Sequence, residues 1–223
     1  MVASLPECVI LDSEAPRHSV IWLHGLGADG HDFEPIVEEL HFPQKAHTRF
    51  VFPHAPVRPV TINNGMAMRA WYDIRSLQID SEEDAAGIHD SARTIEALID
   101  AEKARGIPAG QILLAGFSQG GAIALHTGLR HAERLAGILA LSTYLPLRDD
   151  LAVQRSAANR EAPIFMAHGS HDNVVPVATG RATCALLREL GYAVDWHEYP
   201  MDHAVIPAEI DDIARWLGKT LGD

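Results

Sequence analysis

Short apolar runs alternate with stretches of helical periodicity along most of this chain, and the alternation predicts its fold class. The apolar runs are typical of buried strands and cover residues 8–11, 19–23, 50–52, 112–114, 137–141, 164–168 and 193–199. Helices are predicted between or after them, at residues 33–40, 81–106, 121–130, 177–190 and 207–221. Strands that alternate with helices form βαβ units with right-handed crossovers. We therefore predict an α/β fold with a mostly parallel sheet and helices on both faces.

One stretch, residues 53–78, shows neither the pattern of a strand nor that of a helix. Its prolines, its asparagines and Gly65 interrupt every strand or helix pattern, although its apolar content is too high for a disordered segment. A loop of this length inside a compact domain usually covers a functional site. The helix that follows is predicted to start with a capping box formed by Ser81 and Asp84 and to end at Gly106, before Pro108.

Length and composition indicate one globular domain. The chain has 223 residues, of which 47 % are hydrophobic and 22 % are charged, as in ordinary globular proteins. No linker, repeat or low-complexity segment divides it. We expect residues 1–223 to form a single α/β domain.

The charge balance argues against nucleic acid as a partner, because a formal net charge of −12 with scattered Lys and Arg residues repels a phosphate backbone. Residues 1–19 have no basic region ahead of an apolar one, and the chain has no run of 18 apolar residues. We therefore expect a cytoplasmic protein with no signal peptide and no integral membrane association. Cys8 and Cys184 lie far apart, so neither a disulfide framework nor a zinc site is predicted.

The stretch at residues 111–121, QILLAGFSQGG, presents a candidate nucleophile. Its apolar run is followed by a turn that carries Ser118 and leads into a predicted helix. A serine on a tight strand-to-helix turn brings the neighbouring backbone too close for side chains at Gly116 and Gly120. The G-x-S-x-G pattern alone is weak evidence, so its context decides.

Polar residues follow several of the predicted strands, and in parallel sheets ligands bind beyond the carboxyl ends of the strands. Ser118, Asp172 and His203 are among them, and together they supply a nucleophile, an acid and a base. Their order along the chain, Ser then Asp then His, is that of the α/β-hydrolases.

Alternatives exist for two members of this set. The chain has 13 histidines, and His168 also ends a strand, although it is better interpreted as a hydrogen-bonded core residue. Asp202 is the rival acid, but adjacent residues rarely place a carboxylate on the neighbouring imidazole. Asp172 is also consistent with a carboxylate that only stabilises its own turn.

Several motifs follow one another from residue 20 to residue 203: His24-Gly25-Leu26-Gly27-Ala28-Asp29, Pro53-His54-Ala55-Pro56, Arg69-Ala70-Trp71-Tyr72-Asp73-Ile74, Gly116-Phe117-Ser118-Gln119-Gly120-Gly121, Gly169-Ser170-His171-Asp172 and Tyr199-Pro200-Met201-Asp202-His203. In this order they resemble the phospholipase/carboxylesterase family, which includes bacterial carboxylesterases and acyl-protein thioesterases. The resemblance implies an α/β-hydrolase fold with Ser118 as nucleophile, Asp172 as acid and His203 as base.

The same resemblance implies an oxyanion hole made by the backbone N–H groups of Leu26 and Gln119, and no cofactor or metal. This agrees with the glycine-rich loop after residue 23, whose backbone can approach a ligand closely. Two positions depart from the family. Asp202 stands where the family commonly has glycine before the base, and Thr143 stands where many relatives have glycine.

Four apolar side chains of the long loop are predicted to line a trough for an acyl chain: Met66, Met68, Trp71 and Leu77. The alternative is that some of them only pack the loop onto the sheet. We expect a carboxylesterase that acts on short- to medium-chain acyl esters. An acyl-protein thioesterase or lysophospholipase is the alternative within enzymes, and a non-catalytic binding protein is the competing class. An apolar patch around the loop is a candidate homodimer surface.

Overall fold

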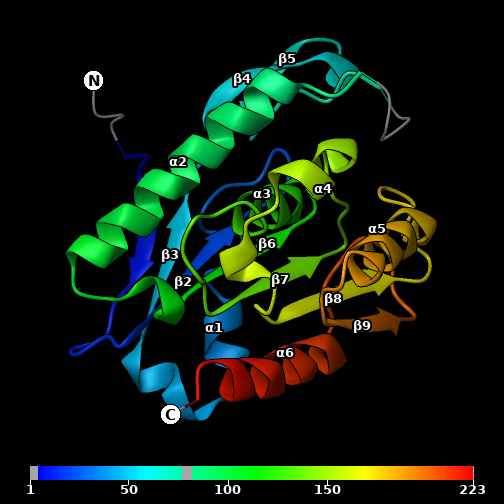
Figure 1. The fold of residues 1–223 in the computed structure, drawn as a ribbon. Helices are drawn as coiled ribbons and strands as arrows, with labels where there is room; N and C mark the ends of the chain where they lie inside the picture. Colours follow the sequence, from blue (N-terminus) through cyan, green and yellow to red (C-terminus); the bar gives the residue numbers. More distant parts are fainter. Residues whose placement is uncertain (1–4, 77–81, 223) are drawn as a thin grey trace.

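A seven-stranded sheet with strand order β1-β3-β2-β6-β7-β8-β9 forms the centre of the computed structural model, which describes residues 5–76 and 82–222 (Figure 1). Its strands are β1 (Cys8–Leu11), β2 (His18–Leu23), β3 (Thr48–Pro53), β6 (Ile112–Phe117), β7 (Gly137–Leu141), β8 (Ile164–Gly169) and β9 (Val194–Tyr199). Only the edge strand β1 runs antiparallel to its neighbour, β3, and each of the other neighbouring pairs is parallel. The predicted mostly parallel sheet is confirmed.

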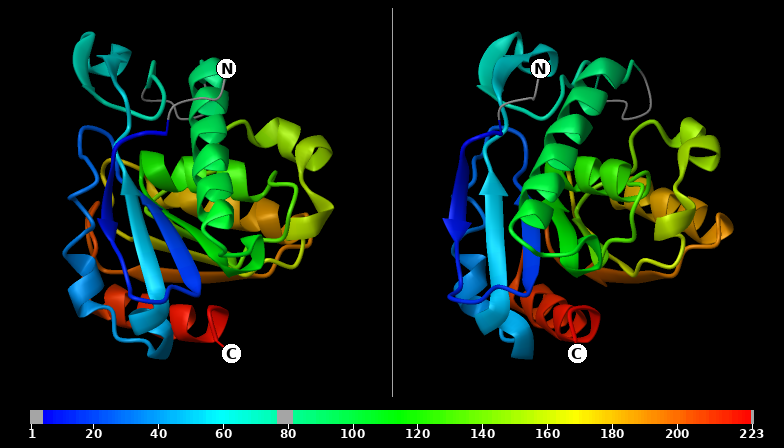
Figure 2. Two further views of the ribbon diagram at one scale, coloured as in Figure 1. Left: turned by 90° about the vertical axis from the view of Figure 1, so that its left-hand side faces the viewer. Right: turned by 60° about the vertical axis from the view of Figure 1, so that its left-hand side comes forward.

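Helices cover both faces of this sheet (Figure 2). They are α1 (Ile36–Glu39), α2 (Ala85–Ala104), α3 (Gln119–Gly128), α4 (Leu151–Gln154), α5 (Val177–Glu189) and α6 (Pro207–Thr220). Because successive strand residues point to opposite faces, β2 contributes Ile21 and Leu23 to the core under α2, α3 and α5, and Val20 and Trp22 to the core against α1 and α6. Every residue of β2 is buried, which explains its continuous apolar run.

The first helix is much shorter than predicted. The apolar pattern predicts a helix over residues 33–40, whereas α1 covers only Ile36–Glu39. Pro35 stands immediately before α1 and disfavours the helical conformation for the residue ahead of it. At the other end Leu40 turns into extended backbone and is completely buried. Packing of one side chain therefore ends the helix where periodicity alone would continue it.

The long loop contains a hairpin that the sequence analysis missed. Strands β4 (Val57–Val60) and β5 (Met66–Arg69) pair antiparallel, and the hairpin lies beside the N-terminal end of α2 (Figure 1). The turn between them contains Asn64 and Gly65, both with positive φ, which is the Asn-Gly signal of a β-hairpin. Pro59 is tolerated because a two-stranded sheet consists of edge strands only.

Helix α2 begins one residue after Asp84, whose carboxylate accepts a hydrogen bond from the Gly87 N–H. Asp84 is therefore the N-cap, and the prediction that it closes a capping box was wrong, because a carboxylate at the N-cap itself satisfies the free N–H of the first turn. Ser81, the other half of that prediction, lies outside the described residues. The predicted end is confirmed, since α2 stops before Gly106, whose φ is +100°. Among the described helices, none combines the length and the apolar character needed to cross a membrane.

Candidate active site

Ser118 occupies a strained turn between β6 and α3. Its φ of 53° and ψ of −120° are rare for a residue other than glycine. A Cβ atom at Gly116 would overlap the backbone of Gly120, and one at Gly120 would overlap the Leu23 carbonyl. The steric argument for both glycines is therefore met in the structure. The close approach of β6, α3 and β2 leaves Ser118 at the carboxyl edge of the sheet.

The end of β7 and the first turn of α3 hold this turn in place. The Ser118 N–H donates to the Leu141 carbonyl at the end of β7, at 2.9 Å. The Ser118 carbonyl accepts from the Thr143 hydroxyl at 2.6 Å and from the Ala122 N–H at 3.1 Å. Thr143, one of the departures from the family pattern, is thus a direct support of the serine turn.

Asp172 and His203 meet above the ends of β8 and β9. Nδ1 of His203 lies 2.7 Å from Oδ2 of Asp172, whose side chain is completely buried. The other carboxylate oxygen, Oδ1, accepts from the N–H groups of Val174 and Val175, both at 2.8 Å. One oxygen therefore stabilises the turn while the other contacts the imidazole. Asp172 thus has both roles considered from the sequence, the turn-stabilising carboxylate and the partner of the histidine.

The rival residues lie elsewhere. Asp202 is exposed, and His203 directs its Nδ1 to Asp172 instead. His168 is completely buried, with Nε2 2.8 Å from the Val175 carbonyl and 3.4 Å from Oδ2 of Asp172. Burial lowers the pKa of His168, which favours its neutral form. Its position as a hydrogen-bonded core residue matches the sequence-based interpretation.

Ser118 and His203 lie at the same edge of the sheet, but in the described part of the chain no hydrogen bond joins the Ser118 hydroxyl to the imidazole. The ring of Phe117 packs on the His203 ring, with 4.6 Å between the centroids. Hydrogen bonds between a nucleophile and its base are often long in free enzymes and shorten when substrate binds. The lack of this bond among the described residues is therefore compatible with a serine–histidine pair.

Leu26, Ser118 and Gln119 border one cavity of about 240 Å³. Gln119 is the first residue of α3, where a helix has unsatisfied N–H groups and a partial positive charge. Within residues 5–76 and 82–222, neither the Leu26 N–H nor the Gln119 N–H donates a hydrogen bond to another protein group. Two free N–H groups beside a serine form a candidate site for a developing oxyanion.

The walls of this cavity are largely apolar, and its lining also includes Asp73, Arg75 and the acidic residues 82–84. Its apolar and aromatic lining consists of Leu26, Ile62, Tyr72, Ile74, Tyr144, Val174 and Val175. Most of these were not singled out by the sequence analysis. The only sequence signal for Val174 is an apolar residue inside a polar turn, and its exposure in the structure is consistent with a ligand-facing position.

Of the residues predicted to form an acyl trough, the three that the structure describes do not line this cavity. Met66 is 65 % exposed on β5, and Met68 packs near Gly27 and accepts from the Asn63 amide through its sulfur. Trp71 is completely buried, so its predicted place in the trough was wrong. An indole needs a partner for its N–H when buried, and Trp71 finds it in the His24 carbonyl at 2.9 Å. Leu77 lies outside the described residues.

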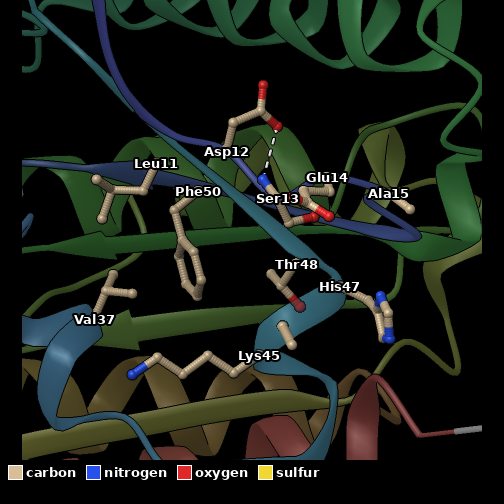
Figure 3. Close-up of a pocket in the computed structure, with 11 residues that line it drawn as sticks. Leu11, Asp12, Ser13, Glu14, Ala15, Val37, Lys45, His47, Thr48 and Phe50 are labelled. Atoms are coloured by element: carbon tan, nitrogen blue, oxygen red, sulfur yellow. Dashed lines mark hydrogen bonds between the residues drawn. The ribbon is translucent and has the colours of Figure 1, made fainter.

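A second hollow, of about 630 Å³, lies at the opposite edge of the sheet. Figure 3 shows the residues that line it. It is lined by residues of the β1–β2 connection, such as Asp12, and by residues around the start of β3, such as Lys45 and Thr48. Parallel α/β sheets bind their ligands at the carboxyl ends of the strands. The larger hollow is therefore at the wrong edge to serve the chemistry of Ser118.

Comparison with known proteins adds an independent line of evidence. Residues 6–221 match the family described as phospholipase/carboxylesterase. Acyl-protein thioesterase 1 of Gibberella zeae is 42 % identical over 93 % of this chain and 93 % of its own length, and that of Neurospora crassa is 44 % identical over 92 % and 88 %. The crystal structure of Arabidopsis thaliana SOBER1 has a TM-score of 0.88 at 31 % identity and covers 92 % of this chain and 100 % of that chain.

Proposed function

The chain belongs to the phospholipase/carboxylesterase family of α/β-hydrolases, and from this premise we propose that it is an acyl-protein thioesterase whose nucleophile is Ser118. The family makes it a serine hydrolase of esters or thioesters. The choice of a thioester follows the curated relatives, which are named acyl-protein thioesterase 1 and are 38–44 % identical over nearly the whole chain. These relatives support the thioesterase alternative better than the short-chain carboxylesterase that the sequence analysis put first.

The reaction begins when the Ser118 hydroxyl attacks the thioester carbonyl. His203 takes the hydroxyl proton, and Asp172 holds the imidazole in the required tautomer and stabilises the imidazolium. The negative charge that forms on the carbonyl oxygen is stabilised by the N–H groups of Leu26 and Gln119. Collapse of this intermediate breaks the carbon–sulfur bond, and His203 returns the proton to the leaving thiol.

Water completes the cycle. His203 removes a proton from a water molecule as its oxygen attacks the acyl-enzyme carbonyl, and the same two N–H groups hold the second oxyanion. The bond to the Ser118 oxygen then breaks, the serine regains its proton from His203, and the fatty acid leaves. Every proton moves between Ser118, His203, water and the two products, so the cycle needs no other reactant.

One observation carries the proposal: Nδ1 of His203 lies 2.7 Å from a fully buried Asp172 carboxylate, at the same edge of the sheet as a serine with a φ of 53°. Backbone strain at a functional residue persists only when the surrounding structure enforces it. A binding protein without turnover would have no use for a strained serine at the same edge of the sheet as a paired histidine. The largely apolar cavity that begins at Ser118 suits the acyl part of the substrate.

The test is an activity panel in which acyl length is held constant and only the leaving group changes. An S-acyl cysteine peptide, a p-nitrophenyl ester and a lysophospholipid, all with the same acyl chain, are compared by kcat/KM. We expect the peptide to be the best substrate and Ser118→Ala to lower kcat by at least about 10³-fold on all three. A clear preference for the lysophospholipid or the simple ester would refute the thioesterase assignment. Turnover by Ser118→Ala would refute the serine mechanism itself.

A further inference from the structure

The peptide unit between Gly25 and Leu26 has one end fixed by a side chain. Nδ1 of His24 lies 2.7 Å from the Gly25 carbonyl oxygen, and the Ala28 N–H donates to the same oxygen at 3.3 Å. A trans peptide is planar, so its C=O and N–H groups point in opposite directions. The contact that fixes the Gly25 carbonyl therefore also fixes the direction of the Leu26 N–H.

The hydrogen bonds of His24 define its tautomer. The Ala55 N–H donates to Nε2 at 3.0 Å, so Nε2 carries no proton and Nδ1 is the donor to Gly25. Burial of the ring lowers the pKa of His24 to about 4, and the ring is accordingly neutral near neutral pH. The imidazole thus connects two backbone segments with one acceptor and one donor.

Trp71 connects the same loop to the start of α3. Its indole N–H donates to the His24 carbonyl at 2.9 Å, and its backbone N–H donates to the Gln119 side-chain oxygen at 2.8 Å. The Gln119 side-chain nitrogen donates in turn to the Tyr72 carbonyl at 2.8 Å. His24, Trp71 and Gln119 are all buried, so water does not compete for these bonds.

We propose that Trp71 and His24 are positioning residues that keep the Leu26 and Gln119 N–H groups aimed at one point, through a chain of hydrogen bonds joining the two segments. The inference rests on the proposed function, because the point in question is where the oxyanion of the acyl transfer forms. Gln119 contributes in two ways. Its backbone N–H is one oxyanion donor, and its side chain forms hydrogen bonds with the backbone of Trp71 and Tyr72, the segment that orients the Leu26 N–H.

The fixed orientation of these N–H groups should matter more for the rate than for substrate binding. A donor stabilises an oxyanion only when it already points at the position where the charge develops. Loss of one such donor lowers kcat by roughly 10²–10³-fold in serine hydrolases. A Leu26 N–H that is free to rotate should lose part of that factor, while the ground-state substrate, held by the cavity walls, should bind nearly as before.

The first test replaces Trp71 by phenylalanine, which keeps an aromatic ring and removes the indole N–H together with part of the buried ring volume. The matched control is Trp216→Phe, since Trp216 is also buried but lies on α6 with the opposite core. Active sites are counted by complete labelling with a fluorophosphonate, and kcat per labelled site and KM are measured with an S-acyl peptide. We expect Trp71→Phe to lower kcat by about 10–100-fold with KM within about threefold, and Trp216→Phe to change neither.

The second test separates the two nitrogens of His24. Asparagine places an amide near the position of Nδ1 and can still donate to Gly25, whereas glutamine reaches the position of Nε2 and leaves the Gly25 carbonyl without its donor. His24→Asn should therefore keep a kcat at least about tenfold above that of His24→Gln. Binding of a trifluoromethyl ketone, which forms a tetrahedral adduct with the serine, should weaken in parallel with kcat/KM across the variants.

Three results would overturn the inference. They are an unchanged kcat per labelled site in Trp71→Phe, a rank order in which His24→Gln equals or exceeds His24→Asn, and ketone affinities that do not follow kcat/KM. The wild-type protein separates this inference from the proposed function. Without wild-type turnover of any acyl substrate the proposed function fails, whereas normal wild-type turnover with unaffected variants rejects only the positioning role.

Discussion

The Thr143 hydroxyl donates a 2.6 Å hydrogen bond to the carbonyl of Ser118, the residue with a φ of 53°. Thr143 follows β7, so the bond ties the end of β7 to the turn that follows the neighbouring strand, β6. A non-glycine residue in such a conformation costs of order 1–3 kcal/mol. The hydroxyl therefore helps to maintain a strained turn.

Replacement of Thr143 by valine keeps the shape of the side chain and removes the hydroxyl. We expect the free energy of unfolding to fall by about 1–2 kcal/mol, because a well-formed buried hydrogen bond is lost and its acceptor retains only the Ala122 N–H. Urea denaturation measures the change. Thr94→Val is the matched control, since the Thr94 hydroxyl also donates to a carbonyl but sits on an exposed helix surface. Equal effects of the two substitutions would contradict the role given to Thr143.

Asp172 contacts the His203 imidazole, whereas Asp202 adjoins His203 only in sequence, so the two carboxylates can be compared. In Asp172→Asn the amide can still accept from Val174 and Val175, but its NH₂ group can donate to Nδ1 of His203 and favour the wrong tautomer. We expect kcat to fall by about 10³–10⁴-fold with little loss of stability. Asp202→Asn, at an exposed residue, should change kcat by less than about threefold. Steady-state kinetics on an S-acyl peptide decides, and a larger effect at Asp202 would reverse the assignment of the acid.

Gly120 has no room for even a methyl group. A Cβ atom there would overlap the backbone of Leu23 and the carbonyl oxygen of His24, and a backbone obstacle cannot easily move. We expect Gly120→Ala to lower stability by at least about 3 kcal/mol, or roughly 6–12 °C in Tm for a chain of this size. Gly110→Ala is the control, because the nearest atom to its Cβ would be the Arg134 carbonyl oxygen at 3.9 Å. A Gly120→Ala protein as stable as the control would show that the β2–α3 contact is looser than the structure has it.

Glu209 is a completely buried carboxyl on α6. Burial raises the pKa of Glu209 from 4.5 to about 8, an effect partly offset by the Ile206 backbone and reinforced by Asp212. Between these two values the folded protein binds more protons than the unfolded chain, so this group makes stability fall as pH rises from about 4.5 to 8. The slope approaches about 1.4 kcal/mol per pH unit in that window.

Glu209→Gln removes this dependence. We expect the variant to gain stability relative to the wild type as pH rises from 5 to 8, by an amount on the order of several kcal/mol. Urea denaturation across this pH range measures the difference. Glu161→Gln is the control, because the Glu161 side chain is 85 % exposed. Wild-type and Glu209→Gln curves that run parallel across the range would mean that Glu209 is not protonated in the folded protein.

Local features of the chain were predicted well. The strand at residues 137–141 and the G-x-S-x-G turn are defined by a few consecutive residues, because strand burial and glycine conformation depend on the immediate backbone. The hairpin at residues 57–69 was missed even though Asn64-Gly65 is a local turn signal. There Pro59 and the exposed Val57 and Met66 concealed the alternation that a strand pairing against a core would show.

The sequence by itself determined the sheet, the serine turn and the small set of polar residues that follow the strands. Only the tertiary structure decided which carboxylate contacts His203 and which side chains border the cavity. It also decided that Trp71, expected in a substrate trough, is buried against a carbonyl 47 residues earlier in the chain. The physical reason is that periodicity and turn chemistry act over a few residues, whereas the direction of a buried N–H is set by whichever distant backbone group packing brings within hydrogen-bond distance.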